Sequence, residues 1–143
     1  MTELTRSTPN TTRTIMGTVT VLYAASFFVG AVLHLGVPIG LGPVVLTEPV
    51  ILPATIVESL CGLGLSVAAF AIFTRKPWAW TAAVAGHAVA LGGVLLGVTA
   101  IMLTGGSSTP LNDTYHRVML LLLAAGLVWL PTRSGRAALR HGQ

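Results

Sequence analysis

The stretch from Val50 to Phe73, VILPATIVESLCGLGLSVAAFAIF, is almost wholly apolar and contains a single charged residue, Glu58. A helix rises about 1.5 Å per residue, so a run of this length can cross the ~30 Å hydrocarbon core of a bilayer. Pro53 is tolerated near the start of such a helix, where a missing amide proton would have no partner. The stretch predicts a membrane-spanning helix over residues 50–73.

Similar apolar runs lie on both sides of this stretch. Of the 143 residues, 53% are hydrophobic and only 8% are charged, whereas a soluble domain averages about a quarter charged. This composition excludes an ordinary water-soluble globule. The breaks between the runs are rich in proline, glycine and polar residues: GVPIGLGPVVLTEP (36–49), TRKP (74–77) and TGGSSTPLND (104–113). We expect an all-α integral membrane protein with four helices over about 15–35, 50–73, 79–103 and 114–130, the last capped by Asp113 or Thr114.

The basic residues predict how these helices are oriented. A polar N-terminal tail (1–14), the 74–77 turn and a basic C-terminal tail (132–143) carry seven of them, against one, Arg117, on the other side. Lys and Arg accumulate on the cytoplasmic side of membrane proteins, so both termini should be cytoplasmic and the cell membrane is the expected location. Short connections then predict an up-down-up-down bundle over 15–131. The seven are Arg6, Arg13, Arg75, Lys76, Arg133, Arg136 and Arg140. Because they mark topology, the net charge of +4 does not predict a nucleic-acid partner.

Glu58 is the first candidate for chemistry, because an ionisable group within hydrocarbon is costly and usually functional. It lies too deep in its helix to reach the surface and must be protonated, paired or hydrated. His87, on the third predicted helix, falls about 6 Å deeper, close enough for the two side chains or a water between them to meet, so a Glu58–His87 pair is one hypothesis. In the alternative, a neutral His87 hydrogen-bonds a neighbouring backbone carbonyl or hydroxyl.

The outer ends of the helices collect further polar residues. We expect them to form a polar mouth above Glu58, with His34, Glu58, Asp113, Tyr115 and His116 as ligand-binding candidates. Glu58, His87 and His116 are the candidates for acid–base catalysis. Alternatively, Asp113 only caps a helix and pairs with Arg117 at the interface.

Other kinds of site receive less support from the sequence. His34 and His116 with one carboxylate would make a two-histidine, one-carboxylate set, but metal-ligand spacings such as HxxxH or CxxC are absent and no metal site is predicted. Cys61 in apolar surroundings predicts packing rather than nucleophilic chemistry. Gly62 on the second helix and Gly93 on the third predict close approach of those two helices.

The chain resembles the DoxX-like family of small bacterial membrane proteins in the order of its features. These are four spans, an acid that opens a glycine-rich second helix (Glu58 in ESLCGLGL), the basic turn TRKP and a third helix rich in small residues. The resemblance covers about residues 50–100. It implies a four-helix bundle, and some members are associated with membrane oxidoreductases that pass electrons to quinone. Glu58 is the residue it carries over. The chain ends in PTRSGRAALRHGQ, where that family often has a glycine-rich, acid-ended motif.

Two classes of function follow. In the first, the protein binds an apolar molecule such as a quinone or lipid, or serves as the membrane subunit of an oxidoreductase complex, with a partner subunit or a second copy docked in the bilayer. In the second, it is a small membrane enzyme in which Glu58 and a histidine act as acid and base on an apolar substrate, in an isomerisation, cyclisation or epoxide opening. Proton or small-cation passage is a third possibility, although the inner half offers few polar residues for a path. No particular cofactor is predicted.

Overall fold

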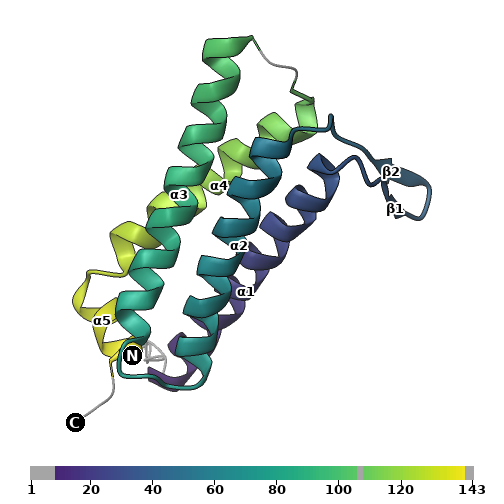
Figure 1. Cartoon of the computed structure of the whole chain (residues 1–143). Helices are drawn as coiled ribbons and strands as arrows, with labels where there is room; N and C mark the ends of the chain where they lie inside the picture. Colours follow the sequence, from purple (N-terminus) through teal and green to yellow (C-terminus); the bar gives the residue numbers. More distant parts are fainter. Residues whose placement is uncertain (1–8, 106–107, 141–143) are drawn as a thin grey trace, which may run out of the picture.

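The structure, a computed structural model, describes residues 9–105 and 108–140. Three long helices, α1 (Pro9–His34), α2 (Leu52–Phe73) and α3 (Ala79–Thr104), run side by side in alternating directions, and α4 (Pro110–Trp129) crosses them at an angle (Figure 1). A short helix, α5 (Arg133–Leu139), follows α4. The start of α1 and α5 lie at one end of the molecule, here called the terminal end. The opposite end, with the short strands β1 (Ile39–Leu41) and β2 (Val44–Leu46), is called the hairpin end.

Among the described residues, three helical segments are long and apolar enough to cross a membrane. They are Asn10–His34, Leu52–Phe73 and Ala79–Leu103, with mean hydropathies of 1.9 to 2.0. A fourth span qualifies only when α4 and α5 are taken together, and those two helices are bent by 87° relative to one another. The expectation of a membrane protein built from apolar helices agrees with this result.

The helix boundaries differ from the predicted ones mainly at two starts. α2 and α3 begin and end within two residues of the predicted ranges, but α1 begins at Pro9 instead of residue 15 and α4 at Pro110 instead of residue 114. Thr109 caps α4 by accepting a hydrogen bond from the backbone N–H of Asn112 at 3.1 Å, so the prediction that Asp113 or Thr114 caps it was wrong. A threonine followed directly by proline is the stronger start signal, because the ring already holds a helical φ.

The connection from α1 to α2 contains a small sheet, which the all-α expectation did not include. β1 and β2 pair antiparallel with Leu41 opposite Val44, and Gly42 between them has a φ of +63°, a conformation that suits glycine. The backbone N–H of Ile51 donates to the carbonyl of His34 at 3.0 Å and closes this connection at its base. The hairpin projects from the adjoining ends of α1 and α2 to the side of the bundle (Figure 1).

The expected basic C-terminal tail is largely helical. Thr132 caps α5, whose Ala138 and Leu139 are buried. The guanidinium groups of Arg136 and Arg140 lie 5.1 and 5.5 Å from the ring centre of Trp80. Arg6 and residues 141–143 lie outside the described residues.

Glycines allow α2 to approach both of its neighbours. A Cβ atom at Gly93 of α3 would collide with Cys61, which agrees with the expected closeness of α2 and α3. A Cβ atom at Gly62, however, would lie 3.0 Å from the Phe28 ring of α1, so Gly62 serves the α1–α2 contact and not the predicted α2–α3 contact.

Candidate functional site

Glu58 lies between two histidine rings near the hairpin end. Its Oε1 atom is 3.9 Å from Nε2 of His34, the last residue of α1, and 4.0 Å from Nε2 of His116 in α4. All three residues are buried, with 5%, 2% and 8% of their surfaces exposed. Three helices thus contribute one ionisable group each to a single buried cluster, which we call the Glu58 cluster.

Backbone carbonyls orient both rings. Nδ1 of His34 lies 3.1 Å from the carbonyl oxygen of Pro49, and Nδ1 of His116 lies 2.9 Å from that of Asn112. A carbonyl oxygen can only accept, so Nδ1 carries the proton in each ring. In the neutral imidazole, Nε2 then presents a lone pair, and on both rings this atom faces Glu58. The separations of 3.9 and 4.0 Å are too long for direct hydrogen bonds and leave room for a bridging group.

Gly30 of α1 makes room for the carboxylate. A Cβ atom on Gly30 would lie 2.6 Å from Oε2 of Glu58, so only glycine fits here while Glu58 keeps its position. Oε2 is buried and has no hydrogen-bond partner among the described residues. The sequence analysis did not identify Gly30, since a glycine within an apolar helix carries no signal of what faces it.

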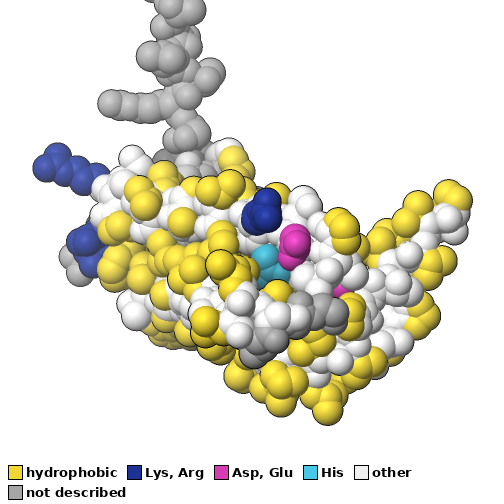
Figure 2. All heavy atoms as spheres, turned by 90° about the horizontal axis from the view of Figure 1, so that it is seen from above, with side chains coloured by type: hydrophobic (Ala, Val, Ile, Leu, Met, Phe, Trp, Pro, Cys, Tyr) yellow, Lys and Arg dark blue, Asp and Glu magenta, His cyan; other side chains and the backbone are white. Residues whose placement is uncertain are grey.

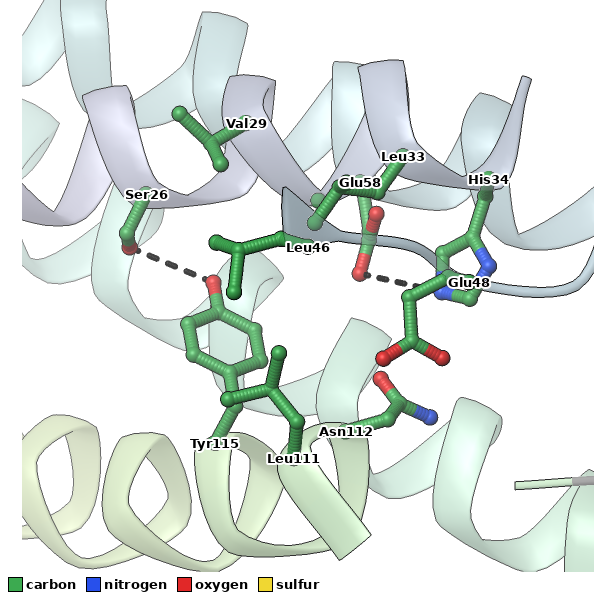
Figure 3. Close-up of a pocket in the computed structure, with 11 residues that line it drawn as sticks. Ser26, Val29, Leu33, His34, Leu46, Glu48, Glu58, Leu111, Asn112 and Tyr115 are labelled. Carbon is green, nitrogen blue, oxygen red and sulfur yellow. Dashed lines mark hydrogen bonds and ion pairs between the residues drawn. The ribbon is translucent and has the colours of Figure 1, made fainter. Parts of the chain in front are cut away.

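A cavity of about 290 Å³ opens on one side of the Glu58 cluster. Figure 3 shows His34 and Glu58 near one end of it and the Ser26–Tyr115 pair at the other, with Leu46 of β2 between them. The hydroxyl of Ser26 donates to the carbonyl of Tyr23, so the Tyr115 hydroxyl donates to Ser26, 3.2 Å away. The remaining lining residues are Val29, Gly30, Leu33, Glu48, Leu111 and Asn112.

A second cavity of about 300 Å³ lies on the other side of the cluster, between α2 and α3. His34 and Glu58 line this cavity as well, and His116 joins them. The other lining residues are apolar: Ile51, Pro53, Ala54, Val57, Gly93, Leu96, Gly97, Ala100 and Ile101. The Glu58 cluster is therefore the polar point shared by two mainly apolar cavities.

Both cavities have walls that also belong to the outer surface of the helices. Val29 and Leu111 of the first cavity are 44% and 47% exposed, and Leu96 of the second is 60% exposed. Each cavity is therefore bordered by apolar side chains that are also exposed on the outside of the helices.

Polar side chains close the hairpin end above the cluster. Thr109 donates a short hydrogen bond to Oε1 of Glu48, whose Oε2 is buried without a partner. Asp113 is exposed and accepts a hydrogen bond from Ser108 at 2.6 Å. This ligand-binding candidate lies outside the two cavities at Glu58 and lines a separate one of about 320 Å³ with His116. Viewed from this end, hydrophobic side chains cover much of the face and the charged ones gather at a few points (Figure 2). Of the predicted mouth, the structure brings His34, Glu58, Tyr115 and His116 to the cavities.

His87 does not meet Glu58. Its Nδ1 atom lies 2.8 Å from the carbonyl oxygen of Ala83, and its ring lies edge-on to Tyr23 with centroids 5.9 Å apart. A Cβ atom on Gly126 of α4 would lie 3.0 Å from the ring. The structure thus places His87 as in the alternative considered for it, bonded to a backbone carbonyl, because α3 meets the region around Glu58 at Gly93, more than one helical turn from His87.

The described residues contain no set of three His, Cys, Asp or Glu side chains that could hold a metal ion. In a tetrahedral zinc site with bonds of about 2.0–2.1 Å, two ligand atoms lie about 3.4 Å apart. The separations around Glu58 are larger, at 3.9 and 4.0 Å. The acceptor atoms around Glu58 are therefore spaced more widely than the ligands of a tetrahedral zinc site.

Comparisons of the chain with protein-family models, curated proteins and solved structures give no significant match. A functional assignment therefore has to come from the chemistry of the residues around Glu58.

Proposed function

We propose that this protein is a multi-pass protein of the cell membrane that binds a small apolar molecule, quinone-like or lipid-like, near the hairpin end. The observation that carries the proposal is that two apolar cavities share one buried polar point, the Glu58 cluster. Ligand sites are mostly apolar with a few convergent polar groups, and they occupy about 300–1,000 Å³. Each cavity is at the lower end of that range, which suits a ring or head group whose chain extends into lipid.

The proposed topology has four spans, with α4 as the fourth, and both termini in the cytoplasm. It is supported by the structure because the first residues of α1 and the helix α5 lie at the same end of the molecule (Figure 1). α5, bent by 87° from α4, would then lie along the membrane surface. The hairpin end would face outward.

The binding proposal is tested by native mass spectrometry of protein extracted gently from its own membrane, before and after addition of decylubiquinone. Gly97→Leu should fill the second cavity, because a Cβ at Gly97 meets only Nε2 of His116, at 3.9 Å. Val29→Trp should narrow the first cavity. A bound molecule should be lost from one of these variants and kept in Gly92→Leu, where an added side chain has open space. Retention in all three variants, or no bound molecule in any sample, would overturn the proposal.

Membership in the DoxX-like family and a role as a subunit of an oxidoreductase complex stay predictions from the sequence. The same extraction tests the subunit role. A stable partner chain should appear with the protein in mild detergent, and a second copy would appear as twice the 14.8 kDa mass.

Catalysis is the second candidate function. It is favoured because the buried carboxylate of Glu58 lies near the Nε2 atoms of two histidines. One bridging atom could hydrogen-bond to the carboxylate and to either histidine. An acid–base reaction on an apolar substrate would then involve Glu58 with His116 or His34 rather than His87. Turnover of an apolar epoxide by the purified wild-type protein, lost in Glu58→Gln, would support it, and absence of turnover with all such substrates would leave binding as the function.

A further inference from the structure

The Glu58 cluster is rich in hydrogen-bond acceptors and poor in donors. In the neutral rings, Nε2 of His34 and Nε2 of His116 are lone-pair acceptors, since Nδ1 of each already donates to a backbone carbonyl. Oε1 of Glu58 faces both of them. All three residues line the second cavity, and each of their side chains is nine-tenths or more buried.

The acidic side chains around Glu58 also lack a Lys or Arg beside them in the described part of the chain. Glu48 and Glu58 both line the first cavity, and each has a buried carboxylate oxygen without a hydrogen-bond partner. Neither cavity is lined by a Lys or Arg among the described residues. Burial by itself favours the neutral acid, and a cationic ligand would stabilise the charged carboxylate of Glu58.

The acceptor atoms and the acidic side chains together favour one kind of ligand head group over others. A hydroxyl donates one hydrogen, a water molecule donates two, and a quaternary ammonium donates none. A primary ammonium donates three and carries the positive charge that the carboxylates lack. Oε1 of Glu58 lies 3.9 Å from Nε2 of His34 and 4.0 Å from Nε2 of His116. Two acceptors at such a separation can both lie about 2.9 Å from one nitrogen, the usual length of this hydrogen bond.

Resting on the proposed binding function, we propose that the ligand is an amphipathic primary amine. Its ammonium group donates to Glu58, His34 and His116, and its hydrocarbon chain lies in the second cavity, which all three residues line, and reaches the lipid. Its source is either a free alkylamine or the ethanolamine head group of a phospholipid.

The test compares three probes with the same eight-carbon chain: octylamine, 1-octanol and octyltrimethylammonium. Binding to the full-length protein in lipid nanodiscs is measured by titration calorimetry. Octylamine should bind at least about tenfold more tightly than either analogue, because 1-octanol lacks the positive charge and octyltrimethylammonium lacks N–H donors. Glu58→Gln should remove this preference, while Asp113→Asn, which removes a carboxylate at the same end but outside both cavities, should keep it.

A second measurement does not depend on any variant folding. In protein labelled with ¹⁵N-histidine, octylamine should shift the Nε2 resonances of His34 and His116 and leave that of His87 unchanged, since His87 packs against Tyr23 and Gly126. Displacement of octylamine by dioleoylphosphatidylethanolamine, but not by dioleoylphosphatidylcholine, would identify the lipid as the source. Displacement by neither would indicate a free amine.

The outcomes separate the two proposals. If the three probes bind equally, ligand binding stands and the assignment of an ammonium group is overturned, as it is if octylamine binds without shifting the two histidine resonances. If neither these probes nor decylubiquinone binds, the proposed binding function itself is wrong. Zinc binding that octylamine does not displace would also overturn the assignment.

Discussion

Gly30 of α1 lies directly against the carboxylate of Glu58 of α2, so that a Cβ atom at Gly30 would be 2.6 Å from Oε2. The absence of a side chain at one position thus determines where an ionisable group sits on the neighbouring helix. It also allows Oε1 to face His34 and His116. The packing of α1 on α2 and the geometry of the Glu58 cluster are consequently the same structural feature.

Gly30→Ala should therefore affect both stability and ligand binding. The added methyl group forces the Glu58 carboxylate or the helix to move, and overpacking of this kind typically costs about 1–3 kcal/mol. Thermal unfolding in detergent should show a lower midpoint, and the bound molecule should be lost. Gly64→Ala is the control, because its Cβ would meet only Gly86 Cα, at 3.9 Å. Equal midpoints for the two variants would show that α1 and α2 are not packed as described.

Two adjacent glycines on α3 offer a matched test of the α2–α3 contact. A Cβ at Gly93 collides with Cys61 and lies 3.1 Å from Val57, whereas one at Gly92 has nothing within 4 Å. Gly93→Ala should lower the unfolding midpoint. Gly92→Ala should leave it unchanged or raise it, since alanine in a helix is favoured over glycine by about 0.5–1 kcal/mol. The reverse order would mean that α3 is rotated.

Glu58→Gln tests whether the carboxylate acts only in packing. Glutamine preserves the shape and most hydrogen bonds but cannot ionise, so we expect a folded protein with an unfolding midpoint close to that of the parent. Because a buried acid facing two histidines exceeds what packing requires, this variant should lose ligand binding or turnover. A folded Glu58→Gln protein with full binding would contradict a functional role for the carboxylate.

The topology can be tested with single cysteines at the two ends of the molecule. Val45 in β2 is 60% exposed at the hairpin end, and Ser134 is exposed in α5 at the terminal end. The native Cys61 is buried and should stay unlabelled. In intact cells, a membrane-impermeant maleimide should label Val45→Cys, and it should label Ser134→Cys only after lysis. Labelling of both in intact cells would mean that the chain crosses the membrane an odd number of times.

Trp80 should hold α5 against the bundle. Its indole N–H donates to the carbonyl of Leu130 at 2.9 Å, and Arg136 and Arg140 of the α5 region stack on its ring. Trp80→Phe removes the hydrogen bond, which is worth about 1 kcal/mol, and weakens the stacking. Trypsin should then cleave after Arg136 and Arg140 faster than in the parent. Trp78→Phe, a change at a residue that is 42% exposed, should leave the rate unchanged.

The sequence alone predicted where the helices lie, because helix formation in an apolar chain depends on local signals. Runs of apolar residues bounded by proline, glycine and polar turns defined α2 and α3 to within two residues. The same reasoning marked Glu58, His34, Tyr115 and His116, since ionisable and polar groups are rare in such segments. It missed the start of α4, where a Thr–Pro cap precedes the apolar run, and the hairpin, whose short strands give a weak pattern.

Only the tertiary structure decided which of these residues meet. α3 lies against the region around Glu58 at Gly93, whereas His87, six residues away, packs against Tyr23 and Gly126. The crossing of α4 brings His116 to Glu58, and the close approach of α1 at Gly30 brings His34. Depth follows from counting residues along one helix, but rotation and crossing angle result from side-chain packing between helices. The pairing of Glu58 with two histidines is therefore a property of the packed bundle.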